Sequence, residues 1–170
     1  RATELDPLRA WSWAGLGHAH LERGETELAR RALQRALEIA PEHEWAFWWM
    51  GEVEYFAGNF KGARSWWRRS TSNYMHVFSE VVVEHALGHD DASRAALGEL
   101  ARKHGDRRPL EVAEAHVARG ETDLGFEWLE RAFALRNDSL EFLKADMWFR
   151  PLHADPRWKA LLKKMNLPVD

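Results

Sequence analysis

Two stretches of this chain repeat each other when Gly24 is aligned with Gly58, because small and apolar residues then fall at matching places on both sides. The first copy contains Trp13, Leu16, Gly17 and His20, then Ala29, Leu33, Ala36 and Pro41. The second contains Phe47, Met50, Gly51 and Glu54, then Ala63, Trp67 and Ser70. Self-similarity at such a period predicts an array of stacked supersecondary units, each of which buries its apolar face against the next.

The residue types within each copy indicate paired helices. Apolar residues recur at helical spacing, which gives each helix one packing stripe. Small residues such as Gly17 and Gly51 allow two helices to approach closely. Gly24 and Gly58 follow helical runs, where a residue in the left-handed conformation ends a helix at low cost. Pro41 ends the second helix of the first copy.

Weaker copies follow further along the chain. The segment EVAEAHVARGETDLGFEWLERAFAL repeats the pattern around Gly120. The separation of Gly58 and Gly120 is slightly less than twice the separation of Gly24 and Gly58, so we expect a contracted copy around Gly88. The expected units are residues 10–43, 44–77, 78–107 and 108–137, with a preceding helix end at 1–9 and a capping segment at 138–170.

The first two copies resemble the tetratricopeptide repeat, whose pattern is W-x2-L-G-x2-Y…A-x3-F…P over about 34 residues. The first copy differs in having His20 for the Tyr and Leu33 for the Phe, and the second has Glu54 for the Tyr and no closing Pro. The resemblance implies an all-α fold, a right-handed superhelix of stacked antiparallel helical hairpins with a C-terminal capping helix. It also implies a protein-interaction function.

Both ends of the sequence suggest a larger context. Residues 1–7, RATELDP, read as the last turns of a preceding repeat helix, so we expect the chain to begin inside a longer array. Residues 130–168 resemble the terminal segment of tetratricopeptide arrays in bacterial regulators, which include winged-helix transcription factors, adenylate cyclases and Ser/Thr kinases. Asp155 and Pro156 read as an N-cap and first helical position. The apolar residues of the helix that follows them, Trp158, Leu161 and Leu162, are expected to cap the stack.

The stretch EWAFWWMGEVEYF, residues 44–56, carries more aromatic surface than one packing stripe needs. Phe47, Met50 and Gly51 occupy the expected stripe, so the remaining aromatics lie on other faces. In the family that the chain resembles, the first helix of each repeat lines a concave groove where peptides lie. The resemblance therefore implies a groove that binds a peptide or protein segment, and aromatic side chains are the commonest hot spots of such surfaces. The candidate binding residues are Trp11, His18, Trp45, Trp48, Trp49, Glu52 and Tyr55.

Burial inside the assembly is the alternative for these aromatics. In a short array the groove is filled equally well by later helices of the same chain or by the second copy in a homodimer, which would make the protein a structural scaffold. For Trp45 and Trp48 both interpretations stay open. Plain core positions are expected for Trp13, Leu33, Phe47, Trp67 and Trp128.

The resemblance also argues against one ligand class. Co-chaperone members of the family bind an acidic C-terminal peptide through Lys, Asn and Arg in the groove. The matching places here hold Ala14, His18 and Trp49, so that clamp is missing. The better expectation is an apolar or aromatic-anchored peptide, with Glu52 and His18 supplying polar contacts.

Catalytic and metal-binding patterns are weak. His85 and His89 are one helical turn apart, but Gly88 lies between them and is expected to end the helix, which favours solvated histidines over a zinc site. The sequence contains no cysteine, phosphate-binding glycine motif or G-x-S-x-G motif. We therefore expect no enzyme activity, no cofactor and no metal.

Nucleic acid and membrane are not expected partners. RSWWRRS, residues 64–70, mixes basic and aromatic residues as nucleic-acid binders do, but Trp67 belongs to the packing stripe and the net charge is −3. No apolar run approaches the ~18 residues of a membrane span, and no secretory signal opens the sequence. A cytoplasmic protein is the expectation.

Overall fold

The computed structural model describes residues 9–169, except for the side chains of residues 138 and 139. Its α-helices are α2 (Ala10–Glu22), α3 (Thr26–Ile39), α4 (Glu44–Phe56), α5 (Phe60–Trp67), α6 (Asn73–Ala86), α7 (Asp90–His104), α8 (Pro109–Ala118), α9 (Thr122–Ala134) and α10 (Pro156–Lys164). Two 3₁₀ helices, η1 (Asp138–Phe142) and η2 (Met147–Leu152), join α9 to α10. The helix end predicted at residues 1–9 lies outside the described residues, apart from Arg9.

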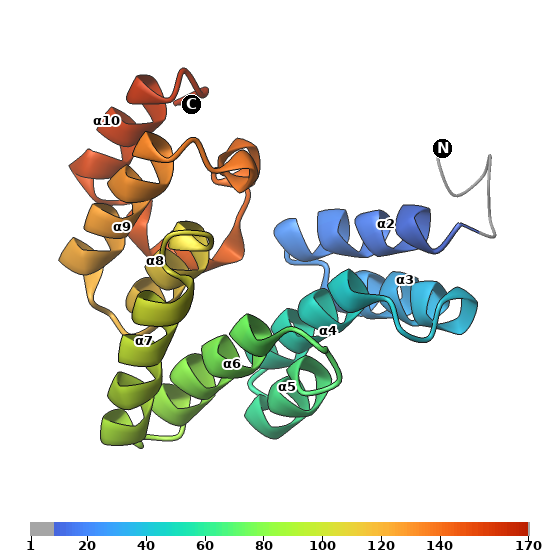
Figure 1. Ribbon diagram of the computed structural model, residues 1–170. Coiled ribbons are helices and arrows are strands. Elements are labelled where there is room, and N and C mark those ends of the chain that lie inside the picture. The colour runs from blue at the N-terminus through green and yellow to red at the C-terminus, as the bar shows by residue number, and fades with distance from the viewer. Residues whose placement is uncertain (1–8, 170) are drawn as a thin grey trace. The chain divides into compact units, whose positions relative to one another are not determined.

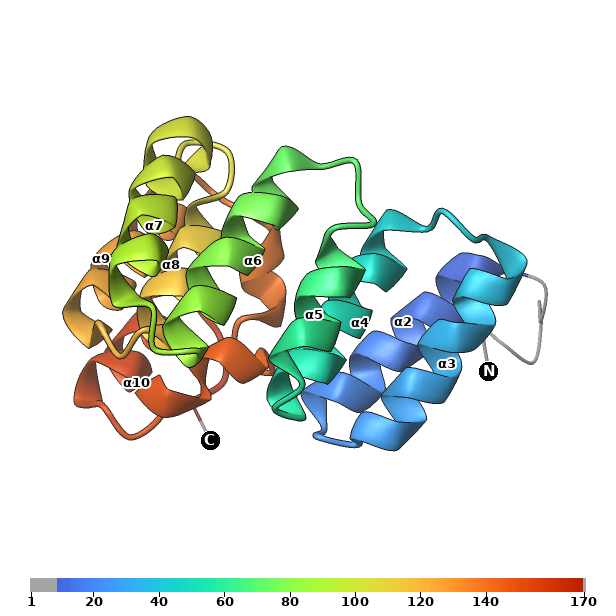
Figure 2. The same cartoon turned by 90° about the horizontal axis from the view of Figure 1, so that it is seen from below.

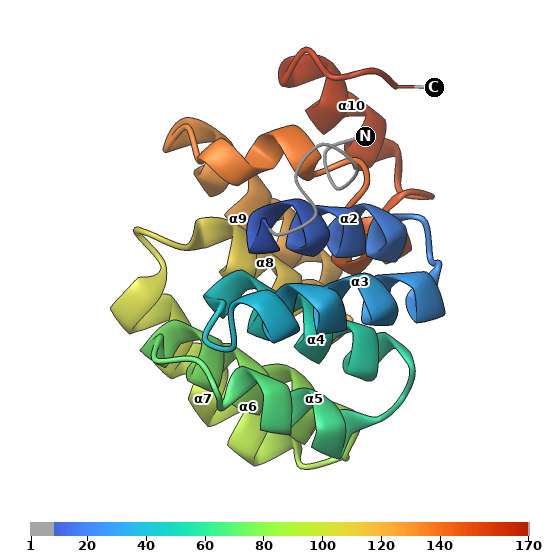
Figure 3. The same cartoon turned by 90° about the vertical axis from the view of Figure 1, so that its right-hand side faces the viewer.

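The predicted all-α class is confirmed, and the described part of the chain is a stack of helical hairpins without strands. The hairpins are α2–α3, α4–α5, α6–α7 and α8–α9, and α2 lies alongside α3 in Figures 1 and 3. Contacts divide the chain into two units, Arg1–Ser79 and Glu80–Asp170. Helix α6 crosses the boundary, so its first turns belong to the N-terminal unit and its last turns to the C-terminal unit.

All four hairpins turn in the same way. Two residues after the first helix of each ends, a glycine adopts φ between 74° and 81°, at positions 24, 58, 88 and 120. The amide after the glycine donates a hydrogen bond to the carbonyl five residues earlier, at 2.8 or 2.9 Å. The side chains of the same two positions also bond to each other. These pairs are His20 with Glu25, Glu54 with Asn59, Glu84 with His89, and His116 with Glu121.

The backbone bond of each turn therefore satisfies a helix-end carbonyl, and the side-chain bond links the same two positions a second time. The weak copies expected around Gly88 and Gly120 share this turn with the strong copies around Gly24 and Gly58. The limits of the individual repeats stay a prediction.

In the N-terminal unit, two glycines let the helices of each hairpin touch. A Cβ atom added to Gly17 would meet the Leu33 side chain at 2.6 Å, and one added to Gly51 would meet the Trp67 indole at 2.3 Å. Trp67 is fully buried, and its Nε1 donates to the carbonyl of Trp48 at 3.0 Å. These contacts explain why the small residues recur with the repeat.

In the C-terminal unit, α10 packs its apolar stripe into a core built by α8, α9, η1 and η2. Figures 1 and 2 both show α10 beside α9. The buried residues of α10 are Trp158, Leu161 and Leu162, which contribute to that core as expected of a capping helix. The predicted helix start is also confirmed, because the Asp155 carboxylate accepts from the Arg157 amide at 2.9 Å and Pro156 is the first helical residue.

None of the helices in residues 9–169 is both long enough and apolar enough to cross a membrane.

Gly51→Ala is expected to destabilise the protein by about 2–3 kcal/mol, because the added methyl group overlaps an indole that is fully buried and has no room to move. Gly15→Ala is the matched control. Gly15 lies within α2 with no neighbouring atom within 4 Å of the added carbon, so the loss of chain entropy alone should make this variant about 0.5–1 kcal/mol more stable. Urea denaturation of both variants measures the difference, and equal shifts would contradict the close approach at Gly51.

Candidate functional site

The first helices of the two N-terminal hairpins, α2 and α4, contact each other and run in the same direction. At their starts, Trp11 of α2 meets the ring of His43, with centroids 4.7 Å apart and planes near perpendicular. Two turns further, His18 of α2 stacks on Trp49 of α4 at 4.6 Å. Trp49 also stacks on Trp45 at 5.7 Å. We call these five residues, Trp11, His43, Trp45, Trp49 and His18, the aromatic row.

Helical periodicity explains why Trp45 and Trp49 of the row lie on one face of α4. Phe47, Met50 and Gly51 form the buried stripe of α4. Trp45, Trp49 and Glu52 follow the i, i+4, i+7 spacing of a second stripe, and the His18–Trp49 stack shows that this second stripe borders α2. The aromatic excess of this helix is thereby divided between the core and a neighbouring helix.

His43 anchors the start of α4 and the exposed end of the row. Its Nδ1 accepts a hydrogen bond from the Ala46 amide at 3.2 Å, so the ring acts as the N-cap and its proton resides on Nε2. Burial lowers the pKa of His43, which favours this neutral form. Trp11 is held against this ring and is still 55% exposed.

His18 is neutral at physiological pH. Burial between the helices lowers its pKa from 6.5 to about 4. Its Nε2 lies 3.6 Å from Oε1 of Glu22, one turn further along α2, and burial raises the pKa of that carboxyl. The imidazole therefore behaves as a flat aromatic ring in the stack, next to a partly buried carboxyl.

Trp48 belongs to the core, so the prediction that it lines an open groove is wrong. It is 6% exposed and its ring contacts Trp67, Tyr74 and Phe78, at centroid distances of 6.0, 5.9 and 4.9 Å. The last two residues come from α6, which covers this side of α4. The alternative of burial by a later helix of the same chain thus holds for Trp48.

Tyr55 and Glu52 are also less accessible than predicted. The Tyr55 ring lies against Phe60 and Trp67 of α5, at 5.3 and 6.2 Å, away from the rings of the row. Burial raises the pKa of its hydroxyl. Glu52 lies on the stripe of the row but is only 7% exposed. Of the seven candidates, the structure brings together Trp11, His18, Trp45 and Trp49, and it adds His43.

The residues considered as zinc or nucleic-acid sites make contacts with their neighbours in the structure. His85 pairs with Asp90 at 2.8 Å and His89 with Glu84 at 2.6 Å, and the described residues contain no group of three ligand side chains placed to hold a metal. In the basic segment 64–70, the Arg69 guanidinium lies over the rings of Phe47 and Trp66, at 4.5 and 4.6 Å.

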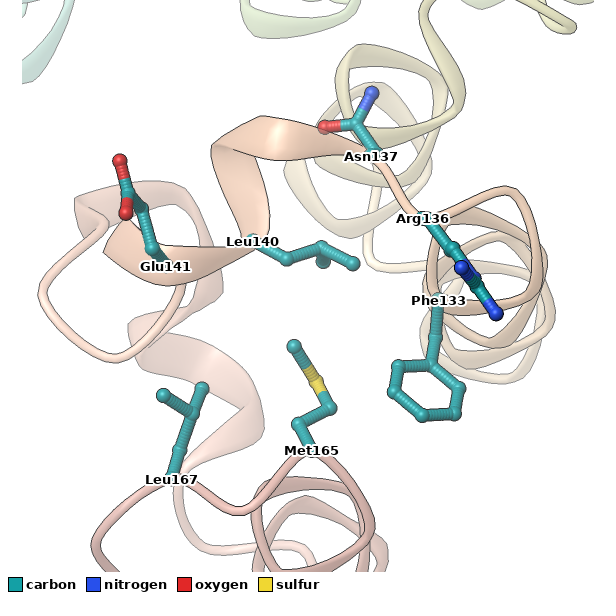
Figure 4. A pocket seen from close by; sticks show the side chains of 7 residues that line it. All are labelled: Phe133, Arg136, Asn137, Leu140, Glu141, Met165 and Leu167. Carbon is teal, nitrogen blue, oxygen red and sulfur yellow. The ribbon is translucent and has the colours of Figure 1, made fainter.

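The C-terminal unit contains a recess of about 370 Å³, between the end of α9, η1 and the residues after α10. Its lining is Phe133, Arg136, Asn137, Leu140, Glu141, Met165 and Leu167. Figure 4 shows Phe133, Leu140 and Met165 pointing toward one another, whereas the amide of Asn137 and the carboxylate of Glu141 point away from them. The recess is thus apolar and does not have the convergent polar groups of a catalytic site.

Residues 10–43, which form α2 and α3, match the family model of the tetratricopeptide repeat. Residues 10–43 are therefore a tetratricopeptide repeat. This repeat family serves protein–protein interaction and is not catalytic. Comparison with curated proteins gives no match. The resemblance of residues 130–168 to bacterial regulators therefore stays a prediction.

Trp48→Ala should destabilise the protein by about 3–5 kcal/mol, because it removes a large side chain from between three helices. Trp66→Ala is the matched control, since Trp66 is only partly buried and contacts Phe47 and Arg69. Thermal melting followed by circular dichroism compares the two. A Trp48 variant that melts no earlier than the Trp66 variant would contradict the core assignment.

The neutral state of His18 predicts a pH dependence of stability. Because its folded pKa of about 4 lies below 6.5, the unfolded chain takes up the proton first, and stability falls as the pH drops from 6.5 through 4. The expected loss is on the order of 2–3 kcal/mol.

The measurement is urea denaturation at neutral and acid pH, with His18→Phe as the comparison because phenylalanine keeps a flat ring and cannot titrate. The raised pKa of Glu22 acts in the opposite direction in both proteins and largely cancels. Parallel pH profiles for the two proteins would show that His18 is freely protonated in the folded state.

Proposed function

We propose that the N-terminal unit is a protein-interaction module that binds a peptide or protein segment along the aromatic row. The observation that carries the proposal is two sets of ring contacts where α2 borders α4, one of Trp11 with His43 and one of His18 with Trp49 and Trp45. Trp11 is also the most exposed large apolar side chain of the described residues. Rings held by stacking lose little side-chain entropy on binding, which is the property of interface hot spots.

The dimensions of the row suit an extended peptide. From Trp11 to His18 a helix rises about 10 Å, which roughly three residues of extended chain would span. The rings of the row come from two helices that run in the same direction, so a peptide lying along them meets Trp11 first and the His18–Trp49 stack two turns later.

The tetratricopeptide repeat at residues 10–43 supports an interaction role. The resemblance of residues 130–168 supports placement in a larger regulatory protein of a bacterial cytoplasm. The partner in this proposal is a protein segment and not a nucleic acid. The competing role is a structural one, in which the same row is covered by a second copy of the chain. It predicts a mass that rises with concentration in light scattering, whereas a module that binds a foreign segment stays a monomer.

Selection from a random twelve-residue peptide display library tests the proposal. The wild-type protein should enrich a family of peptides whose binding is lost, by at least tenfold, in the Trp45→Ala, Trp49→Ala double variant, because these rings form the middle of the row. Trp66→Ala is the control, since it removes a partly buried tryptophan on α5 and should leave binding unchanged.

Circular dichroism establishes that each variant is folded. Enriched peptides that bind the double variant as well as the wild type would place the binding surface elsewhere. Failure to enrich any peptide, together with a concentration-dependent mass, would favour the structural role.

A further inference from the structure

The recess of the C-terminal unit has an apolar floor that is held in place by the core. Phe133, Met165 and Leu167 are partly buried and pack against the core of this unit, and Leu140 belongs to that core. The Phe133 ring is also held by Lys164, whose Nζ lies 5.2 Å from the ring centre. Because these side chains are already fixed by packing, binding at the recess costs little side-chain entropy.

Two side chains of opposite charge also line the recess, Arg136 and Glu141. Both are exposed, and neither side chain makes a hydrogen bond or an ion pair with a residue that the structure describes. Figure 4 shows them on opposite sides of Leu140 and Met165. The recess therefore offers an apolar floor with an available cation on one side and an available carboxylate on the other.

Arg136 occupies a backbone position that glycine fills elsewhere in the chain. It lies two residues after α9 ends and has a φ of 54°, in the left-handed region. Its amide donates to the carbonyl three residues earlier, and the next amide donates to the carbonyl five residues before it, both at 3.0 Å. The same two bonds close the turns at Gly24, Gly58, Gly88 and Gly120. Because a side chain is strained in this conformation, arginine is less stable here than glycine would be.

The end of α10 shows how unusual this choice is. Asn166 has a φ of 56° and makes the same two backbone bonds. Asparagine is, after glycine, the residue that best tolerates the left-handed region, and arginine has no such tolerance. Backbone strain of this kind collects at functional positions. The Arg136 side chain at the edge of the recess is therefore the feature that needs a functional explanation.

We propose that the recess binds a protein segment in which an apolar side chain has an acidic residue on one side and a basic residue on the other. The apolar side chain fills the recess, the acidic group pairs with Arg136 and the basic group pairs with Glu141. The volume of about 370 Å³ is at the lower end of the range for binding pockets, which suits a single large apolar side chain. This surface belongs to the C-terminal unit and does not depend on the function proposed for the aromatic row.

Other ligand chemistries match fewer of these groups. A free apolar amino acid carries both charges on one carbon atom, whereas Arg136 and Glu141 stand on opposite sides of the recess. An amphiphilic acid would match only Arg136, and an amphiphilic amine would match only Glu141. A peptide separates its charges by about 3.3 Å for each residue of extended chain, so its two charged side chains can reach both groups.

Four pools of eight-residue peptides, immobilised on beads, test the inference. Every pool has apolar residues at the two central positions. The residues on the two sides of the centre are Glu and Lys in the mixed pool, and only Glu, only Lys or only Gln in the others. The mixed pool contains both orders, because a peptide can lie in either direction. The mixed pool should retain about fivefold more wild-type protein than any other pool, the gain expected from two exposed ion pairs. A mixed pool with serine at the centre should retain none.

Charge-reversal variants assign the retention to the recess. Arg136→Glu leaves two carboxylates there and should prefer the Lys pool, whereas Glu141→Arg should prefer the Glu pool. A variant that gains a new preference has to be folded, so unfolding cannot mimic this result. Arg102→Glu makes the same charge change at an exposed position of α7 and should keep the wild-type preference. The Trp45→Ala, Trp49→Ala double variant should keep it too, which separates this surface from the aromatic row.

Arg136→Gly tests the strain directly. This variant should melt at a higher temperature than the wild type, because glycine adopts the left-handed conformation without steric cost, and it should lose the preference for the mixed pool. A lower melting temperature would show that the Arg136 side chain stabilises the helix end, and would overturn the functional explanation.

The remaining outcomes each overturn the inference in a different way. Equal retention on the mixed and Gln pools would remove the role of the two charges. A preference for the mixed pool that survives both charge reversals would place the binding site elsewhere, and a preference lost in Arg102→Glu would reduce it to bulk charge. Absence of retention on every pool, with a mass that rises with concentration in the wild type but not in Arg136→Glu, would assign the recess to a second copy of the chain. Absence of retention with a constant mass would leave the recess without a protein ligand.

Discussion

The close approach of Trp67 to Gly51 is the contact on which the N-terminal unit depends. The indole lies where a side chain on Gly51 would be, and its N–H bonds to the carbonyl of Trp48. This contact fixes the rotation of α4 about its own axis relative to α5. Once that rotation is fixed, the stripe of Trp45, Trp49 and Glu52 has to point away from α5, and it meets α2.

The same rotation decides what each aromatic residue of α4 does. Trp48 packs against Tyr74 and Phe78 of α6, and Tyr55 packs against Phe60 of α5. Trp45 and Trp49 stay in the stack with His18. The aromatic residues of α4 therefore pack in the core of its own hairpin, against α6 and against α2. This accounts for the aromatic content of α4 without assigning every ring to a ligand.

The repeat could be predicted from the sequence because its turns need a residue that adopts positive φ at low cost, and its helix pairs need small residues at the contact. Gly24 and Gly58 meet the first requirement and Gly51 meets the second, so each requirement is visible at a single position of the sequence. The cap of α10 is equally local, since Asp155 and Pro156 are neighbours. The burial of Trp48 and Tyr55 could not be predicted, because it depends on how α5 and α6 pack against α4. The role of His43 could not be predicted either, because histidine is an uncommon N-cap.

The neutral state of His18 allows its ring to stack on Trp49 between α2 and α4 without burying a charge. If His18 were protonated at neutral pH, its charge would be buried between α2 and α4, which is the unfavourable state that lowers its pKa. Burial lowers its pKa to about 4, so the ring stacks without neutralising the carboxyl beside it.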